Sequence, residues 1–227
     1  MEMLTITDAP TRINHQAARR FPFASLLLTL VAVIVHMTNG WRVDLLYDRP
    51  ALLGRLEIWR VVTCHWVHLS WDHLFWSGAT FLCLGAVCEL LDQKKTCLTI
   101  MGSVILIPVG IWWGLPGLKV YGGLSGLDCA LYALLFTQLA QREKMSGNRG
   151  WAAVFAAGLL ALLAKVVYET ITGQTIFVSN HHTGMVPVPL SHLIGGLIGG
   201  IVGISQTKKP LFTAPGKAPI RRSGPVF

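Results

Sequence analysis

The chain has 227 residues, of which 52% are hydrophobic and only 13% charged, and its mean hydropathy is +0.54. Roughly a quarter of the residues in a soluble globular domain are charged, so this composition excludes an ordinary soluble domain. The formal net charge of +8 would suit a nucleic-acid partner, but the basic residues are divided among short segments between apolar runs, which indicates membrane topology instead.

Six apolar segments approach the length of about 20 residues with which a helix crosses a bilayer. In chain order they are residues 21–38, 66–90, 96–113, 124–140, 151–168 and 188–205. Asp8 and Arg12 precede the first segment and no small-residue cleavage site follows it, which distinguishes it from a signal peptide. The sequence therefore predicts an all-α, multi-pass membrane protein with a six-transmembrane-helix bundle over residues 21–205.

The positions of Lys and Arg predict on which side of the membrane each end of the chain lies. Most of them precede the first segment or follow the second, fourth and sixth: Arg12, Arg19, Arg20, Lys94, Lys95, Arg142, Lys144, Arg149, Lys208, Lys209, Lys217, Arg221 and Arg222. Basic residues concentrate on the cytoplasmic side, so both termini are expected there. Residues 1–20 then form a cytoplasmic segment, and residues 206–227 form a basic, disordered cytoplasmic tail that either meets anionic headgroups or stays solvated. The short loops favour a bacterial inner membrane.

Two longer loops are expected on the opposite side. Residues 40–62 mix Trp, Leu and charged residues without a spanning run, and such a mixture is typical of a segment at the membrane interface. Residues 169–187 are polar and long, as lids often are. No two of the five cysteines fall within one external loop, so the sequence predicts no disulfide framework.

Three glycines, Gly122, Gly123 and Gly126, surround Ser125 at the start of the fourth segment. Residues 114–123 contain too much Gly and Pro for a regular helix, so the chain is expected to enter the membrane as a loop and to begin its helix near Ser125. Free backbone N–H groups at such a helix N-terminus can stabilise a developing oxyanion. The same residues also suit a plain Gly-rich capping turn with Ser125 as the N-cap.

A serine hydroxyl becomes a good nucleophile only when a base takes its proton, and His192 is the histidine best placed to do so. It opens the sixth segment and is followed by Gly195, Gly199 and Gly203, whose spacing of four lets two helices approach closely. We therefore expect His192 to reach Ser125. The alternative is that the glycines serve packing alone and His192 bonds nearby backbone, although an intramembrane histidine is costly and usually functional.

The second segment carries a polar cluster, HWVHLSWDHLFWSGAT. His73 and Ser77 lie one helical turn apart, and His68 lies just before them. These side chains either line a polar cavity and donate hydrogen bonds to an oxyanion, or bind a metal. The sequence contains neither an HExxH pattern nor a second ligand cluster, which favours the cavity and predicts no metal and no cofactor.

Taken together, these motifs resemble those of the rhomboid intramembrane serine proteases. The resemblance covers residues 57–203 and rests on five motifs in the family's order: Trp59-Arg60 for the Trp-Arg pair of the first external loop; His68, His73 and Ser77 for His-x4-His-x3-Asn; Gly85-Ala86-x-x-Glu89 for the exit of helix 2; Gly123-Leu124-Ser125-Gly126 for the nucleophile; and His192 for the base.

This resemblance implies a serine endopeptidase that cleaves transmembrane protein substrates in or near the bilayer with a Ser125–His192 dyad. Neutral His192 would accept the Ser125 proton as Ser125 attacks a peptide carbonyl, and water would hydrolyse the acyl-enzyme. His73 and the Ser125 backbone N–H would stabilise the oxyanion. His68 would support the wall of a cavity that Gly123 also lines.

The resemblance further implies that the loop 169–187 is a cap that moves for substrate entry. Two positions depart from the family pattern: Ser77 replaces the Asn that stabilises the oxyanion, and Cys129 replaces an aromatic residue that packs on the base. Loss of one oxyanion donor can cost about 10²–10³ in rate. The compact form of the chain also resembles the rhombosortase subgroup, which trims a Gly-Gly-containing C-terminal anchor.

Asp128 lies three residues after Ser125 and is expected inside the membrane. It would either orient His192 or pair with Lys165, and the cost of an unpaired buried charge favours the ion pair. Because Ser77 departs from the family pattern, a catalytically silent protein that binds membrane clients is the alternative function. A small metal or proton transporter would need a repeat or a second set of ligands, and the sequence shows neither.

Overall fold

The computed structural model describes residues 21–38, 40–176 and 186–205. The predictions for residues 1–20 and 206–227, and for the central part of the loop 169–187, lie outside these ranges. Its long helices are α1 (Phe23–Met37), α5 (Trp71–Gly114), α6 (Ser125–Met145), α7 (Arg149–Thr172) and α8 (Pro189–Ile204). The short elements are the helices α2 (Arg42–Leu45), α3 (Arg49–Gly54) and α4 (Arg60–Thr63), the 3₁₀ turn Cys64–Trp66 and the strands β1 (Tyr47–Asp48) and β2 (Val120–Tyr121).

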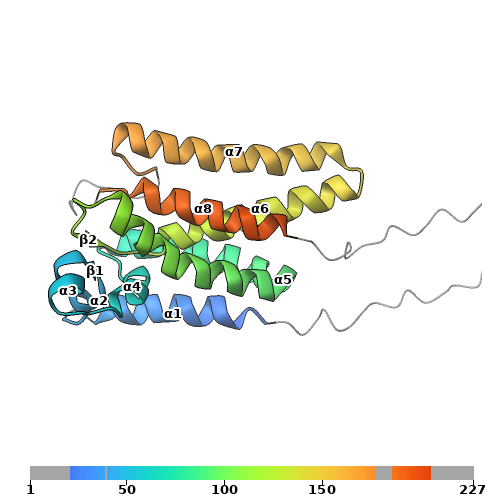
Figure 1. Ribbon diagram of the computed structural model, residues 1–227. Coiled ribbons are helices and arrows are strands. Elements are labelled where there is room, and N and C mark those ends of the chain that lie inside the picture. The colour runs from blue at the N-terminus through green and yellow to red at the C-terminus, as the bar shows by residue number, and fades with distance from the viewer. Residues whose placement is uncertain (1–20, 39, 177–185, 206–227) are drawn as a thin grey trace, which may run out of the picture.

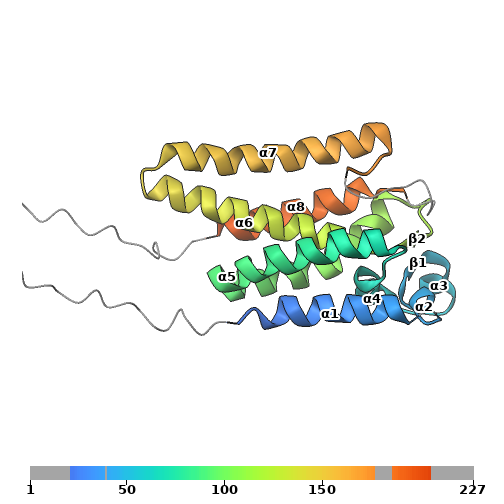
Figure 2. The same ribbon diagram turned by 180° about the vertical axis from the view of Figure 1, so that it is seen from behind.

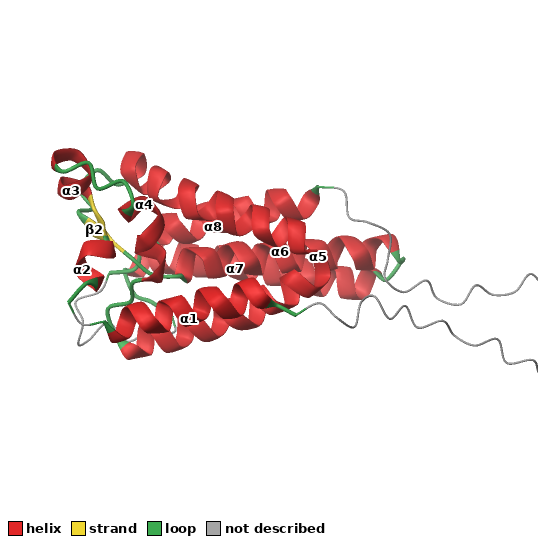
Figure 3. Cartoon of the chain, turned by 90° about the horizontal axis from the view of Figure 1, so that it is seen from below, coloured by secondary structure: helices red, strands yellow, loops and turns green. Residues whose placement is uncertain are grey.

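The long helices run side by side, and the short elements gather at one end of them (Figures 1 and 2). From one face of the bundle to the other, α7 is followed by α8 and α6, then by α5, and finally by α1 (Figure 1). The view from below in Figure 3 shows the same elongated bundle with β2 and α2–α4 at that one end. Among the described residues, α5 and α7 have both the length and the apolarity to cross a membrane, whereas α1 and α8 are shorter apolar helices.

The segments predicted at 66–90 and 96–113 form one continuous element, α5, which is broken at Asp92. Asp92 has non-helical dihedral angles, and its carboxylate accepts a hydrogen bond from Lys95 N at 3.2 Å, so it caps a second arm of the helix. The first arm begins at Trp71 rather than at residue 66, because the Ser70 side chain caps it by accepting from His73 N at 3.1 Å.

The helix predicted at 151–168 extends to Thr172 and ends at Gly173, which has the left-handed φ of 66° typical of a helix C-cap. Glu169 therefore lies in α7, and the prediction that placed it at the start of a loop is wrong. The helix predicted at 124–140 begins at Ser125 and runs five residues further, to Met145.

The core surrounds α6. Its Leu127, Leu131 and Leu134 recur every three or four residues and are fully buried. Helix α8 lies against the same helix through its glycines, because a methyl group added at Gly195 would overlap Gly126 O and one added at Gly199 would overlap Ala130 O. Small residues thus bring the two backbones into direct contact, as the glycine spacing predicts.

The segment between α1 and α5 is organised by Arg60, of which only 2% is exposed. Its guanidinium donates to Val43 O at 2.8 Å, to Leu46 O at 2.9 Å and to the Glu57 carboxylate at 2.5 Å. Hydrogen bonds from Arg55 and Arg60 lower the pKa of Glu57 below its usual value, so this ion pair persists into acidic solution and weakens only when the pH falls through that lowered pKa.

Strand β1 connects this segment to the chain just before Ser125. It pairs antiparallel with β2, with Tyr47 opposite Tyr121. Arg49 N adds a hydrogen bond to Lys119 O at 2.9 Å. The segment predicted to lie at the membrane interface therefore helps to hold the loop that precedes Ser125.

Glu89 on α5 caps the N-terminus of α1. Its carboxylate accepts hydrogen bonds from Ala24 N at 3.2 Å, from Ser25 N at 2.6 Å and from the Ser25 hydroxyl, and Glu89 is only 5% exposed. The negative charge also faces the positive end of the helix dipole. The contact fastens α1 to the rest of the bundle.

Replacing Glu89 with alanine is expected to lower the free energy of unfolding by about 3 kcal/mol, because three donors lose a charged acceptor in a buried place. The measurement is denaturation of the detergent-solubilised protein. Glu143→Ala is the matched control, since the Glu143 carboxylate has no hydrogen-bond partner among the described residues. Equal stability of the two variants would contradict the capping role.

Candidate active site

Ser125 is the first residue of α6, and the turn that precedes it depends on Gly123. Gly123 has φ +118°, a conformation that favours glycine, and its N–H donates to Cys64 O at 3.0 Å. A methyl group at Gly123 would also lie 2.7 Å from His73 Cε1. Only glycine therefore satisfies both the backbone and the space at this position.

His192 on α8 faces Ser125. Its Nε2 lies 3.0 Å from Ser125 Oγ, and the histidine is 4% exposed. Gly195, one turn further along α8, contacts the backbone of Gly126 next to Ser125. The close approach of the two helices is thus what brings the hydroxyl and the imidazole within hydrogen-bonding distance.

The other ring nitrogen of His192 meets a carboxylate from α7. His192 Nδ1 lies 2.7 Å from Glu169 Oε2, and the remaining oxygen of Glu169 accepts from Lys165 Nζ at 2.7 Å. Lys165 Nζ also lies 3.2 Å from His192 Nδ1. A hydroxyl, an imidazole and a carboxylate are therefore linked in series across three helices.

Two histidines support the turn before Ser125. His68 Nε2 accepts a hydrogen bond from Leu124 N at 3.3 Å, while its Nδ1 lies 3.3 Å from Trp66 O. The His73 ring lies against His68, with ring centroids 4.9 Å apart, and its Nδ1 has no partner among the described residues. His68 thus contacts the backbone of the turn, and His73 lines the same turn at Gly123.

The arrangement of Ser125 and His192 is that of a nucleophile beside a general base. The Rhomboid domain model matches residues 55–208, more than half of the chain. The chain belongs to the rhomboid family. Rhomboids are generally intramembrane serine proteases that act on transmembrane substrates, so this rhomboid is an integral membrane protein. The comparison with curated proteins gives no match.

Ser77, which stands where the rhomboid pattern has Asn, lies on α5 close to the buried Asp128. Asp128 Oδ1 is buried and has no hydrogen-bond partner among the described residues. The predicted ion pair between Asp128 and Lys165 is not formed, because Lys165 pairs with Glu169 one turn along its own helix. Asp128 does not bond His192 either.

Sequence reasoning missed Glu169, the residue that does contact His192. A signal was present, since Lys165 and Glu169 are four residues apart and therefore share one face of a helix. An acidic and a basic residue on one face of an otherwise apolar segment indicate an inward-facing polar contact. The predicted helix ends at residue 168, so Glu169 falls in a loop and does not share a helix face with Lys165 in that prediction.

Two histidines outside the rhomboid motifs lie close to backbone carbonyl groups. His65 Nε2 lies 3.0 Å from Val104 O, and His36 Nδ1 lies 3.0 Å from His68 O. Within residues 21–38, 40–176 and 186–205, no three His, Cys, Asp or Glu side chains are grouped so that they could hold a metal ion.

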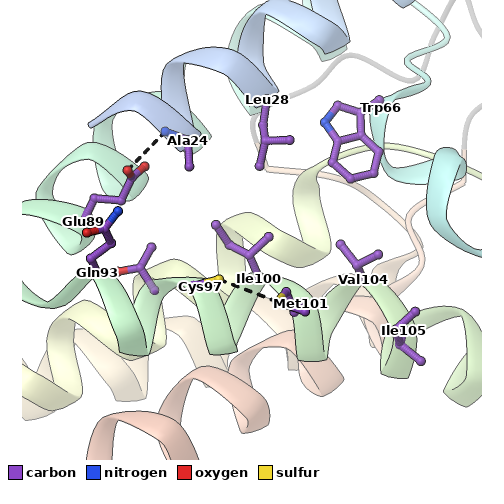
Figure 4. Close-up of a pocket in the computed structure, with 11 residues that line it drawn as sticks. Ala24, Leu28, Trp66, Glu89, Gln93, Cys97, Ile100, Met101, Val104 and Ile105 are labelled. Atoms are coloured by element: carbon purple, nitrogen blue, oxygen red, sulfur yellow. Dashed lines mark hydrogen bonds between the residues drawn. The ribbon is translucent and has the colours of Figure 1, made fainter. Parts of the chain in front are cut away.

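A separate, mostly apolar pocket of about 400 Å³ lies between α1 and α5 (Figure 4). In the close-up, Glu89 reaches toward Ala24 at one end of the pocket and Trp66 stands at the other. The remaining lining residues are Leu28, Gln93, Thr96, Cys97, Ile100, Met101, Val104 and Ile105. The pocket includes neither Ser125 nor His192.

Proposed function

We propose that this rhomboid is an active intramembrane serine endopeptidase that cleaves membrane-anchored proteins in or near their transmembrane segment. The observation that carries the proposal is the 3.0 Å contact between Ser125 Oγ and His192 Nε2 at the buried N-terminus of α6. A hydroxyl that hydrogen-bonds a ring nitrogen can lose its proton to that nitrogen as it attacks a carbonyl carbon.

In the proposed reaction, Ser125 Oγ forms a bond to the carbonyl carbon of the scissile peptide while His192 Nε2 takes the hydroxyl proton. The tetrahedral intermediate collapses, the C–N bond breaks, and the leaving amine takes that proton from His192. Water then attacks the acyl-enzyme with His192 again as base, which releases the acid product and restores the Ser125 hydroxyl.

The oxyanion would be stabilised by backbone N–H groups at the N-terminus of α6, with His73 and Ser77 as side-chain donors and His68 and Gly123 holding the turn. The turn is rigid because Gly123 N and Leu124 N are both hydrogen-bonded, to Cys64 O and to His68 Nε2. Donors held in place before the reaction need no reorganisation when charge develops.

In the membrane, the two arms of α5 together with α1, α6, α7 and α8 would make the six transmembrane helices, with both termini in the cytoplasm. The break at Asp92 and the distribution of basic residues support this topology. A bacterial inner membrane as the location and membership in the rhombosortase subgroup stay predictions.

The test is cleavage of single-span reporter proteins, one of them ending in a Gly-Gly-containing anchor, by the protein reconstituted in lipid vesicles. We expect the wild-type protein to release fragments and Ser125→Ala to release none, because the attacking oxygen is gone. Cleavage by both would place the nucleophile elsewhere. If a folded wild-type protein leaves every reporter intact while still binding it, the silent function suggested by Ser77 is correct.

A further inference from the structure

The contact between Glu169 and His192 is among the most buried polar contacts of the structure. The two side chains are 2% and 5% exposed, and the carboxylate oxygen lies 2.7 Å from the ring nitrogen that faces away from Ser125. Burying a carboxylate is costly, and hydrogen bonds and a nearby positive charge both offset that cost. Lys165, 20% exposed, supplies the compensating charge on the other oxygen.

The geometry determines which ring nitrogen of His192 carries the proton. A carboxylate accepts hydrogen bonds, so Nδ1 must be the protonated nitrogen and donate to Glu169. Nε2 then has a free lone pair directed at Ser125 Oγ, 3.0 Å away. This is the tautomer in which a neutral imidazole can take the proton of a serine.

Without Glu169, Lys165 could favour the other tautomer of His192. Its ammonium lies 3.2 Å from His192 Nδ1 and could donate to that nitrogen if Nδ1 were unprotonated. The proton of the ring would then lie on Nε2, which could no longer accept from Ser125. Because Glu169 accepts from both groups, it occupies Lys165 and keeps the proton of His192 on Nδ1.

We propose that Glu169 is a positioning residue that completes a Ser125–His192–Glu169 series, in which it fixes the tautomer of His192 and stabilises the imidazolium formed as Ser125 attacks. This inference rests on the proposed function, and it replaces the expectation of a dyad without a carboxylate. Glu169 stays ionised throughout, and the proton moves only between Ser125 and His192.

The experiment measures inactivation of the detergent-solubilised protein by a serine-directed fluorophosphonate, separated into the maximal rate kinact and the half-saturating concentration. We expect Glu169→Gln to lower kinact by about 10²-fold or more with little change in the half-saturating concentration, as for the carboxylate of other serine hydrolases. Glu169→Asp keeps the charge and should recover part of that loss.

Two further variants separate positioning from mere stabilisation of α7. Lys165→Met breaks the same ion pair but leaves the contact between Glu169 and His192, so its effect on kinact should be about tenfold or less. In a His192→Ala background, Glu169→Gln should cause no further loss, because a group that acts through His192 has nothing left to act on. If Glu169 only stabilised α7, Glu169→Gln and Lys165→Met would lower kinact by similar factors. Glu169→Gln would then also cause an additional loss in the His192→Ala background.

The outcomes distinguish this inference from the proposed function. If the wild-type protein is labelled at Ser125 and Glu169→Gln and Glu169→Asp are both labelled at the wild-type rate, the positioning role is wrong and the dyad stands. If Glu169→Gln does not fold, Glu169→Asp takes its place in the His192→Ala background, and a further loss of labelling there would overturn the inference. If the folded wild-type protein is not labelled at all, the positioning role of Glu169 and the proposed protease function are both wrong.

Discussion

His192→Ala is expected to lower the rate at which the reconstituted protein cleaves a membrane-anchored reporter by about 10⁴-fold or more. Without a base, the Ser125 hydroxyl attacks with its proton still bound, and the backbone donors at the N-terminus of α6 supply the only remaining assistance. The measurement is the rate of fragment release under conditions of excess enzyme, so that product release does not limit the rate.

Ser191→Ala is the matched control for this loss. Ser191 precedes His192 on α8 and is equally buried, but its hydroxyl donates to Val188 O at 2.7 Å and does not contact Ser125. We expect this variant to keep most of the activity. A similar rate for His192→Ala and the wild type would contradict the role of His192 as the base, whereas equal losses in both variants would indicate damage to α8.

Gly199→Ala and Gly200→Ala are expected to change the stability of the protein in opposite directions, although the residues are neighbours on α8. The added methyl at position 199 would meet Ala130 O and come within 2.8 Å of Ala130 C and 2.9 Å of Leu134 N, so the backbones of α8 and α6 must separate. Such overpacking against backbone costs about 1–3 kcal/mol, and more where neither helix can yield.

At Gly200 the same methyl has no atom within 4 Å among the described residues, and replacing a helical glycine with alanine gains up to about 1 kcal/mol from helix propensity. Separation of the helices at Gly199 would also move His192 away from Ser125, so that variant should lose cleavage activity as well. The measurement is denaturation of both variants beside the wild type. Equal stabilities would contradict the direct contact of α8 with α6.

Much of this architecture follows from patterns in the sequence. The glycine spacing after His192 predicts the close approach of α8 to α6, because only a backbone without side chains can come so near. The Gly and Pro residues before Ser125 predict an irregular segment that ends where α6 begins. The family is predicted by motifs that occur in the family's order, and the match over residues 55–208 confirms it.

Two features of the site could not be predicted from the sequence: the residue at which α7 ends, and the carboxylate with which Lys165 pairs. The end of α7 lies at Gly173, and a helix that extends by one turn moves Glu169 from a loop to the side of His192. In the prediction from the sequence, Asp128 alone is considered as a partner of Lys165. Even with Glu169 placed on the same helix, spacing alone does not rank a contact within one helix against a contact between two. The three-dimensional arrangement ranks them, since Glu169 reaches both Lys165 and His192.

The most direct test of the central claim is to treat the detergent-solubilised protein with a fluorophosphonate probe and to identify the modified residue by mass spectrometry. We predict a single adduct on Ser125 in the wild-type protein and no adduct in Ser125→Ala, because only a serine beside a base is activated toward this reagent. A folded wild-type protein without an adduct, under conditions in which an active rhomboid is labelled, would contradict the account, and so would an adduct on another serine.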